Sequence, residues 1–294
     1  MACSQSDDSP FDVAGRRSIA ERLIADAGHI SASPPVAFQI ASLIRDRMVS
    51  TEDLVDLVRL DPDLTVKLLR MCNSAVFRGN NVSSLHEAAV RLGSHNIATR
   101  AMFVTVGRLM DVPQTAYCPD PNVLWRHSLQ TALAARYLSP FCGQSYNMDT
   151  VFTAGLLHDL GKLVINSGAR NELSQIIVLR EEEKMIDADA ELEVLGADHA
   201  EIGATILERW NLSADIVAGV RFHHAPDCEL SGIANLIHVA NACSKVTGER
   251  ESWEEFENTV HPFVLERLKI DLDDVKTCWA TVVYDTDQIE EYFS

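Results

Sequence analysis

The sequence has no run of about 20 consecutive apolar residues, the length that a membrane-spanning helix needs. Residues 1–8 also lack the basic start and the apolar stretch of a secretory signal peptide. The seven cysteines show no paired spacing and no Cys-x-x-Cys motif, a usage typical of a reducing compartment. We therefore expect a cytoplasmic protein that does not associate with a membrane.

Positive charge is scarce and unevenly distributed. Residues 1–120 carry 12 Lys and Arg against 14 Asp and Glu, a net charge of −2, whereas residues 121–294 carry 13 against 29, a net charge of −16. Such an acidic surface repels a phosphate backbone, so we expect no nucleic-acid partner. A bound cation or a basic partner is easier to accommodate, and an acidic surface that simply keeps the protein soluble is the plainer alternative.

The alternating apolar and polar pattern of half-buried strands is also missing. Short segments with helical spacing take its place, and several of them begin with residues that cap helices: Ser50, Asp61 before Pro62, Ser84 and Ser213. These patterns predict an all-α fold, a helical bundle with an N-terminal helical subdomain. At 294 residues, the chain is long enough for two domains.

Proline and charge divide the chain into four predicted parts. Residues 1–29 form a tail and a short helix, 30–112 an N-terminal helical subdomain, 121–250 a second helical subdomain, and 251–294 a helical extension. The link is the proline-containing segment 111–122. The charged segment 170–193 is expected to be a solvent-exposed helical surface.

The most informative stretch runs from Asp149 to Leu163. Asp149 or Thr150 can cap a helix, and apolar or small residues follow up to the pair His158-Asp159, with Gly161 as the expected stop. An ionisable pair on a buried helix is costly unless something compensates it, and a metal ion compensates a histidine beside a carboxylate. The sequence thus favours a metal site here.

Other predicted helices present similar side chains in apolar surroundings. Together with His158 and Asp159, the candidate ligands are His127, His199, His223, His224 and, on a fifth helix, Asn241. A single histidine on an apolar face is more often a hydrogen-bonded core residue, and we expect this of His29, His86, His95 and His261, while His238 has no assigned role. Burying so many imidazoles without a cation is costly, which favours their convergence on metal.

These motifs resemble the HD superfamily of metal-dependent phosphohydrolases, and over residues 30–250 the HDOD domain, an HD-related output domain of bacterial signalling. The resemblance rests on the following segments: Leu156-Leu-His-Asp-Leu-Gly-Lys162, Asp198-His-Ala-Glu-Ile-Gly203, Arg221-Phe-His-His224, Asp61-Pro-Asp-Leu-Thr-Val-Lys-Leu-Leu-Arg70, Asn73-Ser-Ala-Val-Phe77 and Ala88-Ala-Val-Arg-Leu-Gly93.

The resemblance implies one or two divalent metal ions. One would be held by His127, His158 and Asp159, and a second by His199, His223 and His224, with Asp159 between them. The final aspartate of the related HD-GYP enzymes falls at Asn241, and their Gly-Tyr-Pro tripeptide is absent. A histidine-rich set with one carboxylate suits Fe, Mn, Ni or Zn better than Mg.

Three functions remain open at this point. The preferred hypothesis is a regulatory signalling module that keeps the metal site and binds a protein partner through its N-terminal half. The alternative is a metal-dependent phosphohydrolase acting on a nucleotide or similar phosphoester, with Asp159 and Lys162 as catalytic residues; the Lys162 charge would contact a phosphate or merely complement the end of its helix. A helical adaptor without metal leaves the buried imidazoles unexplained.

Overall fold

The computed structural model describes residues 13–26, 40, 50–74, 82–110, 117, 121–226, 232–246, 250–260 and 262–290. Within these ranges every regular element is a helix, which confirms the predicted all-α fold. The helices are α1 (Val13–Asp26), α3 (Thr51–Arg59), α4 (Pro62–Asn73), α5 (Leu85–Leu92), α6 (Ser94–Met110), α7 (Pro121–Leu138), α8 (Met148–Leu157), α9 (Leu160–Gly168), α10 (Leu173–Glu181), α11 (Asp187–Leu195), α12 (His199–Arg209), α13 (Ala214–Arg221), α14 (Ile233–Cys243), α15 (Arg250–Thr259), α16 (Pro262–Leu268) and α17 (Leu272–Glu290).

Side-chain caps begin most of the helices that the sequence predicts. Ser50, Asp61, Ser84 and Ser213 each accept a hydrogen bond from a backbone N–H in the first turn of the helix that follows. The side chain of Asp198 does the same for α12. These contacts satisfy donors that a helix start leaves without a partner, so local sequence sets these boundaries.

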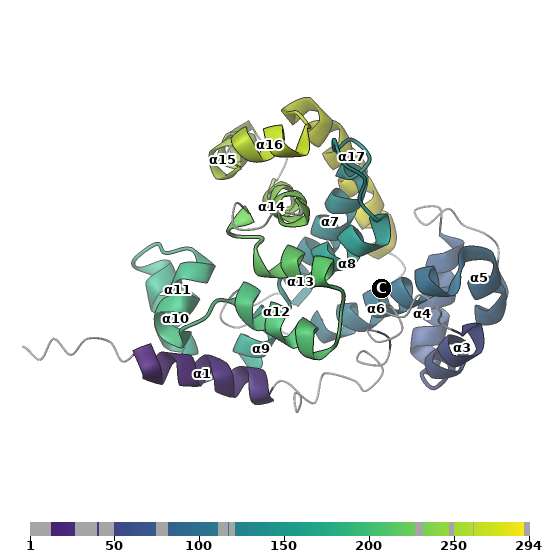
Figure 1. The fold of residues 1–294 in the computed structure, drawn as a ribbon, viewed down its shortest axis with the longest axis horizontal. Helices are drawn as coiled ribbons and strands as arrows, with labels where there is room; N and C mark the ends of the chain where they lie inside the picture. The colour runs from purple at the N-terminus through teal and green to yellow at the C-terminus, as the bar shows by residue number, and fades with distance from the viewer. Residues whose placement is uncertain are drawn as a thin grey trace, which may run out of the picture.

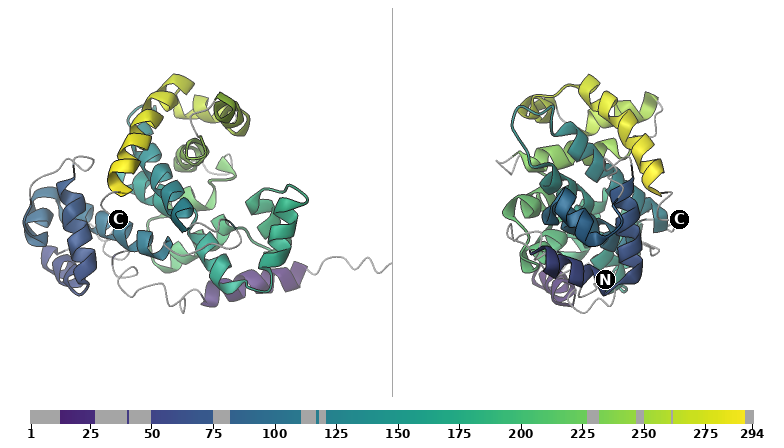
Figure 2. Two further views of the ribbon diagram at one scale, coloured as in Figure 1. Left: turned by 180° about the vertical axis from the view of Figure 1, so that it is seen from behind. Right: turned by 90° about the vertical axis from the view of Figure 1, so that its right-hand side faces the viewer.

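The N-terminal helices α3, α4 and α5 lie at one end of the molecule (Figures 1 and 2). The longer helix α6 packs against all three and also against α7 and α8, so it joins this end to the rest. Phe103 of α6 contributes to this junction, with ring centroids 4.8 Å from Trp125 of α7 and 5.8 Å from Phe152 of α8. The predicted subdomain boundaries remain predictions.

Helix α7 is the centre of the second helical unit. It packs against α8, α14 and the C-terminal helix α17. The Tyr137 hydroxyl of α7 donates to the Asp285 carboxylate of α17, and Arg126 forms ion pairs with Asp287 and Glu290. The helical extension is therefore built onto the element that carries His127.

The stretch from Asp149 to Leu163 differs from its sequence prediction. Its cap is Asn147, whose side chain accepts from the backbone N–H groups of both Asp149 and Thr150. The helix divides at His158-Asp159: α8 ends just before this pair and α9 begins just after it, so Gly161 lies inside α9 and is not a stop. A close approach accounts for this glycine, because a Cβ at Gly161 would lie 2.0 Å from the His199 carbonyl oxygen.

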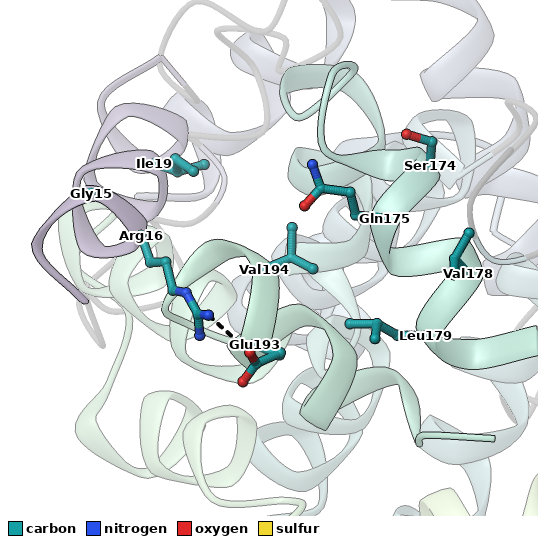
Figure 3. Close-up of a pocket in the computed structure, with 9 residues that line it drawn as sticks. All are labelled: Gly15, Arg16, Ile19, Ser174, Gln175, Val178, Leu179, Glu193 and Val194. Atoms are coloured by element: carbon teal, nitrogen blue, oxygen red, sulfur yellow. Dashed lines mark hydrogen bonds and ion pairs between the residues drawn. The ribbon is translucent and has the colours of Figure 1, made fainter. Parts of the chain in front are cut away.

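Helix α1 lies across α9, α11 and α12. A surface cavity of about 590 Å³ opens between α1, α10 and α11, with Ile19, Val178 and Val194 among its walls (Figure 3). At its edge Arg16 of α1 forms an ion pair with Glu193 of α11, with Nη2 2.9 Å from Oε1. Of the helices in the described ranges, none combines the length and the apolar character that crossing a bilayer requires.

Candidate metal centre

Four places in the helical unit supply the candidate ligands. His127 belongs to α7, the pair His158-Asp159 occupies the break between α8 and α9, and His199 is the first residue of α12. His223 and His224 follow α13, which ends at Arg221. The six residues form what we call the histidine cluster, consisting of His127, His158, Asp159, His199, His223 and His224.

The histidine cluster consists of two groups of three. In the first triad (His127, His158 and Asp159) and in the second triad (His199, His223 and His224), one candidate ligand atom from each residue lies within 4.8 Å of the others. Asp159 connects the triads, since its Oδ1 is 3.5 Å from His158 Nε2 and 3.2 Å from His199 Nε2. Its Oδ2 is 3.4 Å from His127 Nε2.

The outer ring nitrogens determine which tautomer three of the histidines adopt. His158 Nδ1 is 2.7 Å from the Gly155 carbonyl oxygen and His223 Nδ1 is 2.6 Å from that of Val220, and a carbonyl can only accept. Ser244 Oγ donates to the Asn241 carbonyl, so at 2.8 Å it accepts from His127 Nδ1. In the neutral form, each of these rings therefore carries its lone pair on Nε2.

The inner ring nitrogens of the cluster lie close to one another. His127 Nε2 lies 3.1 Å from His158 Nε2, and His199 Nε2 lies 2.9 Å from His224 Nε2. His223 Nε2 and Asn241 Oδ1 are buried and have no hydrogen-bond partner in the described part of the chain. Buried acceptors that face one another are costly unless a cation lies between them, so the donor set fits a divalent metal.

Burial strongly shifts the pKa values of the cluster. It lowers the pKa of His158 to about 3 and that of His224 to about 2, and it lowers the pKa of His223 well below its usual value. Burial alone would raise the pKa of Asp159, but the neighbouring His158 and Lys162 hold it well below its usual value. These three histidines thus offer neutral imidazoles beside one ionised carboxylate, the forms that bind metal.

His199 differs because a second carboxylate contacts it. Burial acts to lower its pKa, but the charge of Glu191 together with hydrogen bonds to Asp159 and Glu191 raises the pKa to about 9. Glu191 Oε2 accepts hydrogen bonds from both Nδ1 and the backbone N–H of His199, each at 2.6 Å. The contact directs His199 Nε2 toward Asp159 and His224.

Lys162 lies beside the cluster in a network of charges. Its Nζ is 2.9 Å from Asp159 Oδ2 and 3.1 Å from Asp187 Oδ2, while Arg180 Nε is 2.6 Å from the other oxygen of Asp187. Burial acts to lower the pKa of Lys162, but these carboxylates raise it above its usual value. The lysine is therefore charged, and two acidic side chains neutralise that charge.

A model of the HDOD domain matches residues 30–226 of this chain. The chain belongs to the HDOD family. This match confirms the resemblance that the sequence motifs indicate, and it extends from the N-terminal helices through His223 and His224.

Individual relatives of this HDOD protein are distant. An uncharacterised protein of Treponema pallidum is 26% identical over 251 residues, which are 84% of this chain and 47% of the relative. Ribonuclease Y of Pelobacter propionicus is 26% identical over 253 residues, 85% of this chain and 40% of that enzyme. The chain thus spans about half, or less, of the length of these curated relatives.

One similar solved structure is an HDOD domain protein of unknown function from Geobacter sulfurreducens. The two folds superpose with a TM-score of 0.75, at 24% sequence identity, over 96% of this chain and 99% of the other. This likeness supports the helical fold.

The structure brings together the residues that the sequence singles out as ligands. The six members of the histidine cluster meet, and Lys162 is paired to one of them. Asn241 lies one turn before Ser244, the residue that contacts His127. His238 Nδ1 lies 2.8 Å from the His223 carbonyl oxygen. His86 is exposed, so the prediction that it is a core residue is wrong. His29 and His261 lie outside the described residues.

Sequence reasoning missed the residues that support these histidines. The charged segment 170–193 was expected to face solvent, but its Glu191 is fully buried and its Asp187 pairs with Lys162. The prediction is wrong there because Glu191 shares the buried face of α11 with Ala188 and Leu195, three residues before it and four after. That helical spacing was a usable signal, whereas nothing local marks Tyr117 or Ser244.

Proposed function

We propose that this chain is a bacterial signal-transduction HDOD protein that holds one or two divalent transition-metal ions in its helical bundle. The observation that carries the proposal is the convergence of the two triads on Asp159, beside a buried His223 Nε2 that has no hydrogen-bond partner among the described residues. HDOD membership supports the signalling role.

The donor set indicates how the metal would be held. His127, His158 and Asp159 would bind one ion and His199, His223 and His224 another, with the amide oxygen of Asn241 as a further donor to the first. Imidazole-rich ligation suits Fe, Mn, Ni or Zn. A bound ion of this kind acts as a Lewis acid toward a phosphoryl oxygen and lowers the pKa of a bound water.

Two features favour regulation over catalysis. Lys162, the candidate phosphate-binding cation, is already neutralised by Asp159 and Asp187. Asn241 brings no negative charge to the first triad. We propose that a protein partner, not yet identified, binds the N-terminal helical half, and that the metal centre stabilises or regulates the second unit.

A metal-dependent phosphohydrolase is the second candidate. The complete set of six ligand-type residues favours it, as does the similarity over 253 residues to a protein named ribonuclease Y, although this chain spans only 40% of that enzyme. In this case Asp159 and Lys162 would be catalytic, and the substrate would be a nucleotide or another phosphoester.

Metal analysis tests the proposal directly. Protein purified without chelators is expected to contain transition metal, and His158→Ala and His223→Ala should each lower that content. His86→Ala, which removes an exposed imidazole outside the cluster, is the matched control and should leave it unchanged. Less than about a tenth of an equivalent of metal in the unaltered protein, before and after incubation with Zn²⁺ or Mn²⁺, would contradict both candidate functions.

Turnover separates the two candidates. The regulatory proposal expects no hydrolysis of bis(p-nitrophenyl) phosphate by metal-loaded protein above the level of its Asp159→Ala variant. Hydrolysis that is abolished in Asp159→Ala but persists in His86→Ala would instead establish the phosphohydrolase.

A further inference from the structure

Glu191 is a fully buried acid on α11, a helix that also carries exposed acidic side chains. Its side chain is 0% exposed, whereas Glu193, two residues further along α11, faces the surface cavity and pairs with Arg16. Positions two residues apart lie on roughly opposite sides of a helix. A buried carboxylate is costly unless hydrogen bonds compensate it, so the partners of Glu191 indicate why it is there.

Both oxygens of Glu191 have a partner in the described structure. Oε2 accepts from the ring Nδ1 and from the backbone N–H of His199, and Oε1 accepts from the Tyr117 hydroxyl at 2.7 Å. Burial, together with the charges of Glu191, Asp187 and Asp159, raises the pKa of Tyr117 well above its usual value, so the hydroxyl keeps the proton that it donates.

Two cations lie close to the ring of Tyr117. Its ring centroid is 5.5 Å from Lys162 Nζ and 5.5 Å from Arg180 Cζ, distances at which a cation is attracted to an aromatic face. Both cations are also paired to Asp187. The hydroxyl therefore approaches Glu191 from a ring whose position the charged network around Lys162 restricts.

We propose that Glu191 and Tyr117 are the positioning residues of the second triad: Glu191 sets the ring orientation and the Nδ1 protonation of His199, and Tyr117 holds Glu191. The proposal rests on the metal-binding function proposed above. A carboxylate on the outer nitrogen of a histidine ligand fixes its tautomer and makes its inner nitrogen a stronger donor. If Glu191 accepted only from the backbone N–H of His199, it would simply satisfy a free donor at the start of α12. Its second hydrogen bond, from His199 Nδ1, acts on the imidazole ring itself.

The pair also connects the metal centre to the other half of the molecule. Tyr117 lies between the end of α6 at Met110 and the start of α7 at Pro121. Helix α6 packs against α3, α4 and α5. The residue that holds Glu191 therefore belongs to the segment that joins the N-terminal helices to the metal-binding unit.

The test compares Glu191→Gln and Tyr117→Phe with the unaltered protein by Zn²⁺ titration calorimetry. Glutamine keeps the size and one acceptor oxygen but removes the charge, and phenylalanine removes only the hydroxyl. We expect Glu191→Gln to weaken Zn²⁺ binding at the second triad about 10–100-fold. Tyr117→Phe should weaken it about 2–10-fold, the value of one hydrogen bond. Binding at the first triad should not change.

Matched controls come from the same chain. Glu193→Gln makes the same chemical change on the outer face of α11, and Tyr284→Phe removes an exposed hydroxyl on α17. Both should bind Zn²⁺ as the unaltered protein does. Unchanged affinity in Glu191→Gln or Tyr117→Phe would overturn the assignment of that residue, and an equal loss at both triads would show a general structural defect instead.

Nitrogen-15 NMR of the histidine rings separates positioning from stability. In metal-free protein the His199 Nδ1 proton should resonate far downfield, as expected of a hydrogen bond to a carboxylate, and should move upfield in Glu191→Gln but not in Glu193→Gln. This readout does not require metal, so it still tests the positioning role if no Zn²⁺ binds and the proposed function fails. A His199 Nδ1 resonance that is identical in Glu191→Gln would overturn the inference.

Discussion

At the residue scale, burial determines which charge each histidine of the cluster carries. The pKa values of His158, His223 and His224 are all lowered by burial, to about 3 for His158 and about 2 for His224. In an unfolded chain the same side chains titrate near 6.5. His199 has the opposite shift, to about 9, because Glu191 contacts it.

These shifts predict that the stability of chelator-treated protein depends on pH. Below about pH 6.5 the unfolded chain binds protons that His158, His223 and His224 do not, so unfolding becomes easier by about 1.4 kcal/mol per pH unit for each of them. The contribution of His199 is complete below about pH 6.5 and is lost as the pH rises through about 9. Urea unfolding from pH 5 to 9 should therefore show maximal stability near neutral pH, and a monotonic profile would contradict this.

Asn241 presents a buried acceptor oxygen that has no hydrogen-bond partner within the described ranges. Asn241→Asp should lower the unfolding free energy of metal-free protein by about 3 kcal/mol, because it buries an uncompensated charge. Zn²⁺ should recover most of that loss, since a cation at the first triad compensates the carboxylate. Both values follow from urea unfolding with EDTA and with Zn²⁺.

Asn235→Asp is the control for that experiment. Asn235 lies on the same helix, is fully buried, and its Oδ1 also lacks a partner in the described structure. Asn235 is not among the candidate ligands. The Asn235→Asp variant should therefore be destabilised to the same degree with Zn²⁺ as with EDTA. Equal recovery of both variants would show that Zn²⁺ does not bind beside Asn241.

At the element scale, the crossing of α9 and α12 places His199 next to Asp159. The two helices meet at glycines: a Cβ on Gly161 would lie 2.0 Å from the His199 carbonyl oxygen, and a Cβ on Gly203 would lie 3.1 Å from the Gly161 nitrogen. Backbone atoms cannot rotate away as a flexible side chain can. The close crossing thus sets the distance between the two triads.

The two glycines therefore predict a graded response. Gly161→Ala should force α12 away from α9, lower the unfolding free energy by about 3 kcal/mol, and impair Zn²⁺ binding at the second triad. At Gly203 the nearest atom would be farther from the added Cβ. Gly203→Ala should therefore lower the unfolding free energy by only about 1 kcal/mol and leave Zn²⁺ binding nearly intact. Thermal unfolding measures the loss of stability in both variants, and Zn²⁺ titration measures the loss of binding. Equal effects at the two positions would contradict the claim that the close approach at Gly161 sets the distance between the triads.

At the scale of the whole molecule, the candidate ligands come from segments far apart in the chain, from His127 to His224. An unfolded chain does not hold them together, so metal binds the folded state preferentially. Zn²⁺ at about 100 times its Kd should add about 2.7 kcal/mol to the unfolding free energy.

Thermal unfolding tests this linkage. The added stability corresponds to a rise in Tm of about 5–10 °C for a domain of this size. EDTA should abolish the rise, and it should be absent or much reduced in His158→Ala but normal in His86→Ala. A rise in Tm of the same size in His158→Ala would place the ion outside the first triad.

The helical class, several helix starts and the candidate ligands could all be predicted from the amino-acid sequence alone. Caps such as Asp61 and Ser84 act on a backbone N–H three residues away, so the information needed to predict them is local. The ligands were recognisable because ionisable side chains in apolar helices are rare.

The contacts that support those ligands became visible only in the folded protein. Glu191 contacts His199 from the preceding helix, Tyr117 contacts Glu191 across 74 residues, and Ser244 contacts His127 across 117. Contacts of this kind arise from packing between distant segments, and no local pattern of residues specifies them.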